Sequence, residues 1–273
     1  MESPRRRSNS KVHRNPYKFL GVVAVSVFAV LGYLSYRNSV MERLYAEAAG
    51  YPKFFRRSKE SANAVNELAS YHGRRSTELL INIAINRGPF VSSDAQAAAI
   101  DALSKRKDPD IAVMLAGLLQ PHQGLDVRRE AATALKKLPC NSLCVRAILH
   151  YLERTSQGQL NSEDLVVRPA GFDDVSISLE KDQTVVYNDL YAVLRREKAE
   201  TLINLSQVYG LGSDDPSLFA LDLSTKLGIH EACPVLKESD HAIMELSEPN
   251  KAPREAVQTA LSSLQCDRAP AAP

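Results

Sequence analysis

The sequence predicts an all-α protein: an α-solenoid of stacked helix pairs that follows an N-terminal transmembrane helix. Three observations lead to this prediction. An uncharged run extends from Phe19 to Tyr36, and Ala-rich amphipathic segments recur along Ser61–Arg154 and Ser217–Cys266. Between the two repeat regions, residues 155–187 have a different composition, which predicts a small β-hairpin or loop insertion.

The first element is the uncharged run Phe19–Tyr36, which Lys18 and Arg37 bracket. As a helix it would reach roughly 27 Å, close to the thickness of about 30 Å of a membrane's hydrocarbon core. The tail before it, residues 1–18, holds six Lys and Arg residues and one Glu. By the positive-inside rule this basic tail is cytoplasmic. The run then predicts a single-pass signal-anchor, with the C-terminal domain extracytoplasmic, or periplasmic in a bacterium.

A cleaved signal peptide is the alternative interpretation of this run, and it would make the chain a secreted, soluble solenoid. Signal peptides have shorter apolar cores and small residues at the cleavage site. Here the stretch from Leu34 to Ser39, LSYRNS, is a poor cleavage site. We therefore favour a retained anchor, residues 19–36, followed by a juxtamembrane helical linker over residues 37–60.

Charge and motifs argue against several classes of protein. Residues 19–273 contain 28 Lys and Arg against 31 Asp and Glu, without the concentrated basic face that nucleic-acid binding requires. The sequence has no P-loop, no G-x-S-x-G and no G-x-G-x-x-G, and its six histidines form no H-E-x-x-H or H-x-x-x-H pattern. We therefore expect that the protein is not an enzyme and that it binds no cofactor, metal ion or small-molecule substrate.

Four cysteines occur, at Cys140, Cys144, Cys233 and Cys266. In an oxidising compartment an even number allows two disulfides, Cys140 with Cys144 and Cys233 with Cys266. The alternative is that all four are small buried thiols. A zinc site is disfavoured because the C-x3-C spacing lacks a matching His or Cys pair.

Internal similarity is the second strong signal. Segments that begin at Ser61, Ala97 and Glu130 each open with an Ala-rich helix that ends at a leucine, namely Leu68, Leu103 and Leu135. A short polar break follows in each segment, and then a second helix with apolar residues at steps of three and four. Such helix pairs bury their apolar faces only by stacking on their neighbours.

The segment Lys226–Leu236, KLGIHEACPVL, resembles the K-L-G-x-x-E-A-x-P-x-L hinge of HEAT repeats, particularly the short phycobilisome-lyase type. Asp108-Pro109 matches the Asp-Pro of the same hinge, and the EAVQTALSSLQC segment from Glu255 repeats the pattern of EAATALKKLPC from Glu130. The resemblance covers a little over half of the chain. It implies HEAT-like repeats over residues 61–154 and further repeats with a terminal cap over residues 188–266.

The interruption, residues 155–187, begins with polar TSQGQLNSED and continues with the β-branched runs LVVRP, DVSISL and QTVVY. These runs predict the β-hairpin, with an unstructured loop as the alternative. One long helix is expected from Asn188 to Tyr209, and residues 267–273 are expected to be a disordered tail.

These features predict a membrane-anchored HEAT-repeat scaffold that binds a partner protein outside the cytoplasm. The HEAT resemblance implies that second helices line the concave side. The candidate contacts there are Glu78, Asn82, Arg146, His150, Glu153, Lys237 and His241. The alternative is a lyase-like or chaperone-like accessory subunit for a cofactor-bearing protein, because fold alone does not decide function.

Overall fold

The computed structural model describes residues 16–50, 58–86, 90–120, 123–156, 174–246 and 251–267. It describes the side chains of these residues except in 16–25, 58, 156, 174–182 and 251–252. This part of the chain is all-helical and contains no strand. The helices are α1 (Pro16–Ala48), α2 (Ser58–Ser70), α3 (Arg74–Ala84), α4 (Ser93–Ser104), α5 (Pro109–Gly117), α6 (Leu125–Leu135), α7 (Ser142–Ser156), α8 (Asp174–Arg196), α9 (Lys198–Tyr209), α10 (Leu218–Leu227), the 3-10 turn η1 (His230–Ala232), α11 (Cys233–Glu245) and α12 (Lys251–Ser263).

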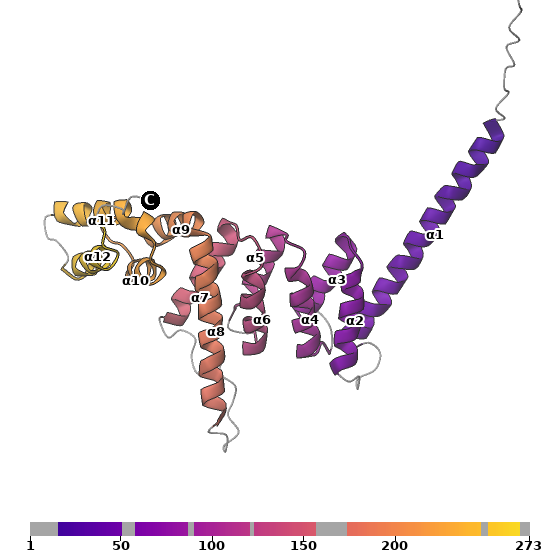
Figure 1. Cartoon of the computed structure of the whole chain (residues 1–273), viewed down its shortest axis with the longest axis horizontal. Coiled ribbons are helices and arrows are strands. Elements are labelled where there is room, and N and C mark those ends of the chain that lie inside the picture. The colour runs from indigo at the N-terminus through magenta and orange to yellow at the C-terminus, as the bar shows by residue number, and fades with distance from the viewer. Residues whose placement is uncertain are drawn as a thin grey trace, which may run out of the picture.

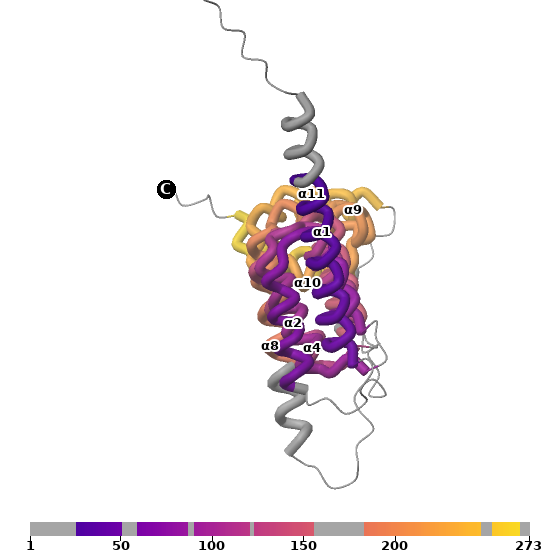
Figure 2. The backbone as a smooth tube through the Cα atoms, turned by 90° about the vertical axis from the view of Figure 1, so that its right-hand side faces the viewer, coloured from indigo at the N-terminus to yellow at the C-terminus, as the bar shows by residue number. Residues whose placement is uncertain are grey.

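The helices are arranged in two rows (Figure 1). In one row α2 contacts α4, α4 contacts α6, and α6 contacts α8; in the other α5 contacts α7, and α7 contacts α9. Seen from the α1 end of the molecule, α2, α4 and α8 lie one behind another (Figure 2). This arrangement is compatible with an α-solenoid, in which each helix pair buries its apolar face against the next.

The residue types explain the close stacking of the first row. Ala99 of α4 and Ala131 and Ala132 of α6 are fully buried, so small side chains allow the helices to approach closely. Leu103 and Leu135 occupy the same place near the end of their helices and are also fully buried. Burial of each leucine contributes roughly 1.5–3 kcal/mol.

The array begins with α1, whose C-terminal part packs on α2 and α3. Met41, Leu44 and Ala48 are buried there, and Glu42 forms an ion pair with Arg75. Farther towards the N-terminus the side chains are exposed, including Val27, Phe28, Val30, Leu31, Tyr33, Leu34 and Tyr36.

The predicted membrane localisation requires a correction. Residues 19–25 of the predicted span lie outside those whose side chains are described. In the described part of the chain no helix has the length and apolar character needed to cross a membrane. Beyond Tyr36, α1 carries Arg37, Glu42 and Arg43, and this half of the helix packs on α2 and α3. The prediction of a single-pass protein with a cytoplasmic N-terminus and an extracytoplasmic domain is therefore not supported.

The predicted β-hairpin is also wrong where the structure describes it. DVSISL and QTVVY belong to α8, which begins at Asp174. Val186, Leu190 and Val193 recur at steps of four and three and are fully buried, so the helical period and packing against α6 outweigh the β-propensity of valine. LVVRP and the rest of residues 157–173 lie outside the described residues, as do residues 1–15 and 268–273.

The long helix expected from Asn188 to Tyr209 is instead divided. The backbone at Glu197, with φ −97° and ψ 47°, separates α8 from α9. Asp189 of α8 accepts bonds from Thr133 Oγ1 and Lys136 Nζ of the α6 region, both at 2.8 Å. These contacts fix α8 on the first row and leave α9 to pack on α7.

The last three α-helices form a unit of their own, in which α12 packs on α10 and α11 and closes the array. Figure 1 shows them at the end opposite to α1. A disulfide between Cys233 and Cys266 joins the start of α11 to the chain after α12, and a second joins Cys140 and Cys144 before and within α7. These are the two pairs considered from the sequence.

Candidate protein-binding site

Three of the seven candidate contacts, Arg146, His150 and Glu153, lie together on α7 at helical spacing. Arg146 Nε donates to Asn204 Oδ1 of α9 at 3.2 Å, and His150 Nδ1 lies 3.8 Å from Glu153 Oε2. Asn204 is fully buried and also donates to Ser142 Oγ at 3.0 Å. These bonds hold α9 against α7. They thereby fix the positions of the residues at the C-terminal end of α9.

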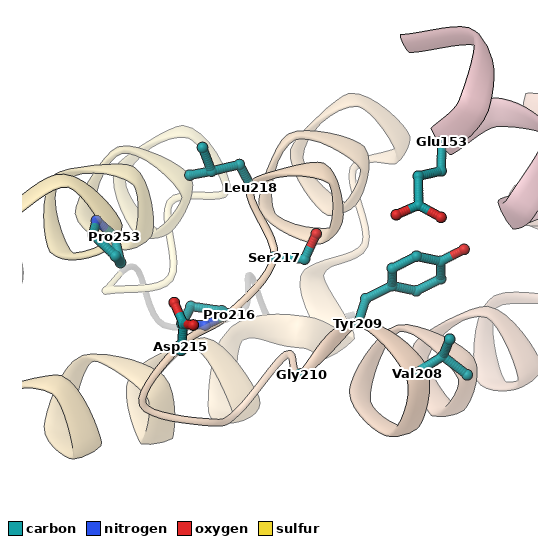
Figure 3. Close-up of a pocket in the computed structure, with 9 residues that line it drawn as sticks. All are labelled: Glu153, Val208, Tyr209, Gly210, Asp215, Pro216, Ser217, Leu218 and Pro253. Atoms are coloured by element: carbon teal, nitrogen blue, oxygen red, sulfur yellow. The ribbon is translucent and has the colours of Figure 1, made fainter. Parts of the chain in front are cut away.

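An open pocket of about 700 Å³ lies beside Glu153, where the chain passes from α9 to α10 (Figure 3). Its lining comes from the ends of α7 and α9, the turn after α9, and the starts of α10 and α12. The residues are Glu153, Val208, Tyr209, Gly210, Asp215, Pro216, Ser217, Leu218 and Pro253. The pocket therefore occupies the junction between the stacked rows and the C-terminal unit.

Two glycines allow the turn that shapes this pocket. Gly210 ends α9 with φ 67°, and Gly212 has φ 97°; other residues rarely adopt either conformation. A Cβ at Gly212 would lie 2.8 Å from Val235 Cγ1 of α11. The Gly212 N–H donates to Ser239 Oγ at 2.7 Å, so the turn is tied to α11.

Two carboxylates and two hydroxyls are the polar side chains among the described residues of the pocket. Burial raises the pKa of the Tyr209 hydroxyl, and the neighbouring Glu153 carboxylate, which accepts its hydrogen bond, raises this pKa further. The phenol is therefore a neutral donor at ordinary pH. Asp215 contributes a second carboxylate at the other end of the lining in Figure 3, and the described residues that line the pocket include no Lys, Arg or His.

Apolar side chains at the pocket remain open to solvent. Leu218, the first residue of α10, is 62% exposed, and Val208 of α9 is 46% exposed. Pro216 and Pro253 are buried and form part of the wall. A surface that combines exposed apolar side chains with a few polar groups in a concave site is typical of ligand and protein-binding sites.

The remaining four candidate contacts lie elsewhere, at opposite ends of the array (Figure 1). Glu78 of α3 is paired with Arg74 at 2.9 Å and Arg75 at 3.3 Å, and Asn82 is half-buried on the same helix. On α11, Lys237 Nζ donates to Cys266 O at 3.2 Å, and His241 lies 3.5 Å from Glu245. The structure does not bring these four residues to the pocket.

Val208, Tyr209, Asp215 and Leu218 were not among the functional residues predicted from the sequence. Residues 210–216, GLGSDDP, have the composition of a turn, because Gly, Ser, Asp and Pro are typical turn residues. The pocket is formed by the packing of α7, α9 and α12, and no local sequence pattern predicts how these distant helices pack. The one available signal was the apolar Leu218 directly after a polar turn.

Side chains that could hold a metal ion do not gather in this site: over the described ranges, no three His, Cys, Asp or Glu residues form such a group. All four cysteines are in disulfides. Comparison with protein-family models, with curated proteins and with solved structures finds no match to the chain.

Proposed function

We propose that the protein is a HEAT-like helical-repeat scaffold that binds a partner protein through the pocket between α7, α9 and α10. The observation that carries this proposal is the open pocket of about 700 Å³ with Leu218 and Val208 exposed at its edge. Exposed leucine and valine beside a concave surface gain free energy when a partner covers them.

The arrangement of the helices supports the same proposal. Two rows of stacked helices resemble a repeat scaffold, and the hinge Lys226–Leu236 resembles that of HEAT repeats. Scaffolds of this kind present extended surfaces for binding. The three α7 residues Arg146, His150 and Glu153 would then border the binding site, with Glu153 inside it.

Site-specific photo-crosslinking tests the proposal. A photoreactive amino acid replaces Leu218, and in a matched control it replaces Leu143, which is 61% exposed at the start of α7 and does not line the pocket. We expect a defined crosslinked protein from position 218 and none from position 143. The crosslinked protein is then identified and purified for direct binding measurements.

In those measurements the Leu218→Ala variant should bind the purified partner at least about fivefold more weakly, since burial of a leucine side chain contributes more than 1 kcal/mol. Leu143→Ala should bind as the wild type does. Equal affinity of wild type and Leu218→Ala would overturn the proposal. A visible absorption band in the purified protein would instead support the alternative of an accessory subunit for a cofactor-bearing protein.

A further inference from the structure

We propose that Arg128 of α6, together with the hydroxyls of Tyr151 of α7 and Tyr187 of α8, binds a small oxyanion, a carboxylate or phosphate group. These three residues are not among those that line the pocket beside Glu153, so the inference goes beyond the proposed function and does not depend on it. Three properties support it: the burial of the arginine, an excess of hydrogen-bond donors, and a pocket that opens beside them.

Arg128 is a buried arginine without a hydrogen-bond partner for its Nε atom in the described part of the chain. The residue is only 5% exposed. Moving a guanidinium out of water costs free energy unless acceptors replace the lost water. In native proteins, a buried polar group that the protein leaves unpaired commonly has an ordered water or an ion as its partner. The partner that Arg128 requires is therefore an acceptor.

Carboxylates on the helices that pack around this arginine are paired with other cations. They are Asp101 of α4, Asp126 and Glu130 of α6, and Asp189 of α8. Asp101 and Asp189 lie within 3.2 Å of lysine ammonium groups, and Asp126 and Glu130 lie 4.0 Å and 3.4 Å from Arg129. These four carboxylates thus face four cations, namely Lys105, Lys136, Lys137 and Arg129. The charge of Arg128 remains in excess and attracts a further anion.

Two tyrosine hydroxyls lie near the arginine. Tyr151 is 3% exposed, and its hydroxyl is also without a hydrogen-bond partner among the described residues. Burial raises the pKa of this hydroxyl, and the charge of Arg128 opposes the rise, as a nearby guanidinium does. The hydroxyl of Tyr187, which also influences Tyr151, accepts from Gln183 Nε2 at 3.0 Å and keeps its own proton to donate. The guanidinium and the two hydroxyls offer donors, and an oxyanion supplies acceptors for all of them.

A pocket of about 200 Å³ opens beside these residues, between α7, α8 and α10. Tyr187 lines it together with Leu152, the residue after Tyr151. The charged residues of its described lining, Asp222 and Lys226, pair with each other at 2.6 Å. The pocket therefore brings solvent to Tyr187, and the charges of its lining balance, so that a small anion can approach.

Isothermal titration calorimetry of the full-length protein with sodium phosphate and with sodium acetate tests the inference. Both titrations are made in sodium chloride at constant ionic strength, which keeps charge screening equal. We expect one saturable site for at least one of the two anions, with a dissociation constant on the order of 1 mM. Binding of phosphate alone would identify a phosphate group as the ligand, and binding of acetate would identify a carboxylate.

Three variants locate the site. Arg128→Met removes the charge and keeps an unbranched apolar side chain, and it should weaken binding at least about tenfold. Tyr151→Phe removes only a hydroxyl and should weaken binding about threefold or more. As the matched control, Arg74→Met removes a side chain of α3 that is 94% exposed, and it should bind as the wild type does.

Stability in the absence of both anions separates binding from a purely structural role of the arginine. In sodium chloride, Arg128→Met should have a urea midpoint equal to or higher than that of the wild type, because it removes a buried charge without a partner. The anion that binds should then raise the midpoint of the wild type more than that of Arg128→Met. The rise in the variant measures the general stabilising effect of the salt.

Three results would overturn the inference. They are no saturable binding of either anion up to about 10 mM, unchanged affinity in both Arg128→Met and Tyr151→Phe, or a urea midpoint of Arg128→Met well below that of the wild type in chloride. The last result would show that water or the protein itself already satisfies the arginine. If Arg128→Met does not fold, Tyr151→Phe alone decides. The photo-crosslink at position 218 is independent of these measurements, so failure of this inference and failure of the proposed function are distinguishable.

Discussion

Arg106, in the turn after α4, holds together the start of α3. Its guanidinium donates to Ser76 Oγ at 2.9 Å, to Tyr71 O at 3.3 Å and to Gly73 O at 3.4 Å, and it also contacts Thr77 Oγ1. Partial burial lowers the pKa of Arg106, although an arginine stays charged throughout the ordinary pH range. One side chain therefore satisfies several polar groups between two consecutive helix pairs.

Replacing this residue should reduce the stability of the array. Arg106→Ala leaves the acceptors of the α2–α3 turn without their donor, and we expect a loss of about 2 kcal/mol in the free energy of unfolding. Arg106→Lys should recover only part of the loss, because an ammonium cannot reach several acceptors at once. Urea denaturation measures both, with Lys105→Ala as control; its ion pair with Asp101 is exposed and should contribute less than about 1 kcal/mol. Equal losses for Arg106→Ala and Lys105→Ala would contradict this assignment.

Tyr209 should make stability depend on alkaline pH. Its pKa in the folded protein is raised by burial and by Glu153, whereas in the unfolded chain it is about 10. Above about pH 10 the unfolded chain therefore binds fewer protons than the folded protein, and stability falls as pH rises. In Tyr209→Phe the urea midpoint should fall less between about pH 8 and about pH 11. Burial also raises the pKa values of Tyr151 and Tyr191, so part of the decline remains in the variant. An identical decline in both proteins would contradict this account.

Local sequence patterns predict the role of a single residue well when the groups it contacts are close to it in the chain. The Asp108-Pro109 hinge is an example: Asp108 Oδ1 accepts from the Asp110 N–H at 2.9 Å and Pro109 begins α5. Glu153 was a candidate because the HEAT resemblance implies that second helices line the concave side, and it does line the pocket. Tyr209 and Asp215 join it only through packing of distant segments, which no local period encodes.

At the scale of elements, the C-terminal cap is held by groups at the end of α12. The disulfide Cys233–Cys266 encloses α11 and α12, and His230 Nδ1 lies 3.0 Å from Leu264 O. Lys237 Nζ reaches Cys266 O and Asp267. On the inner face of α12, Val257 is fully buried. The cap therefore depends on attachments near its C-terminal end.

The two disulfides should differ in their response to a reductant. Cys140 and Cys144 are 4% and 0% exposed, whereas Cys233 and Cys266 are only partly buried. With increasing dithiothreitol, mass spectrometry after alkylation should detect thiols at Cys233 and Cys266 first. The double variant Cys233→Ser with Cys266→Ser should lower the free energy of unfolding by about 3–4 kcal/mol, because that disulfide closes the longer loop. It should also speed hydrogen exchange in α12, while Cys140→Ser with Cys144→Ser should leave α12 unchanged. Simultaneous reduction of both bonds would contradict the role of burial.

Element boundaries show where sequence interpretation fails. The repeat helices α4 and α6 follow from Ala and Leu at helical spacing, and both appear. α8 was missed between Asp174 and Tyr187 because its valines and isoleucine favour strands as isolated residues. The helix α8 packs on α6, which lies some fifty residues earlier in the chain, and Thr133 of α6 donates a hydrogen bond to Asp189 of α8. Contacts of that range are absent from any local window, so the helix could not be recognised there.

At the scale of the whole molecule, the stacked rows and the C-terminal unit should unfold separately. α10 makes few contacts with α8 and α9 compared with those it makes with α12. Stability in such arrays is local to neighbouring repeats. Leu236→Ala should therefore destabilise α10–α12 by about 2–5 kcal/mol. Leu103→Ala should destabilise α2–α6 by a similar amount. Both leucines are fully buried.

Hydrogen exchange with mass spectrometry at increasing denaturant distinguishes the two regions. In Leu236→Ala the amides of α11 and α12 should lose protection, while those of α4 and α6 keep the wild-type rates. Leu103→Ala should give the reverse pattern. Uniform loss of protection along the chain in either variant would mean that the molecule unfolds as one cooperative unit.

The projection of α1 beyond the array has a geometric consequence. From Tyr36 back to Ser26 the side chains are exposed, and over this stretch the helix advances about 15 Å. Contacts of Arg37 with Tyr71 and of Glu42 with Arg75 set its direction at the base. Because the helix extends outward from this base, a small rotation of α2 and α3 would move its outer end farther than its base.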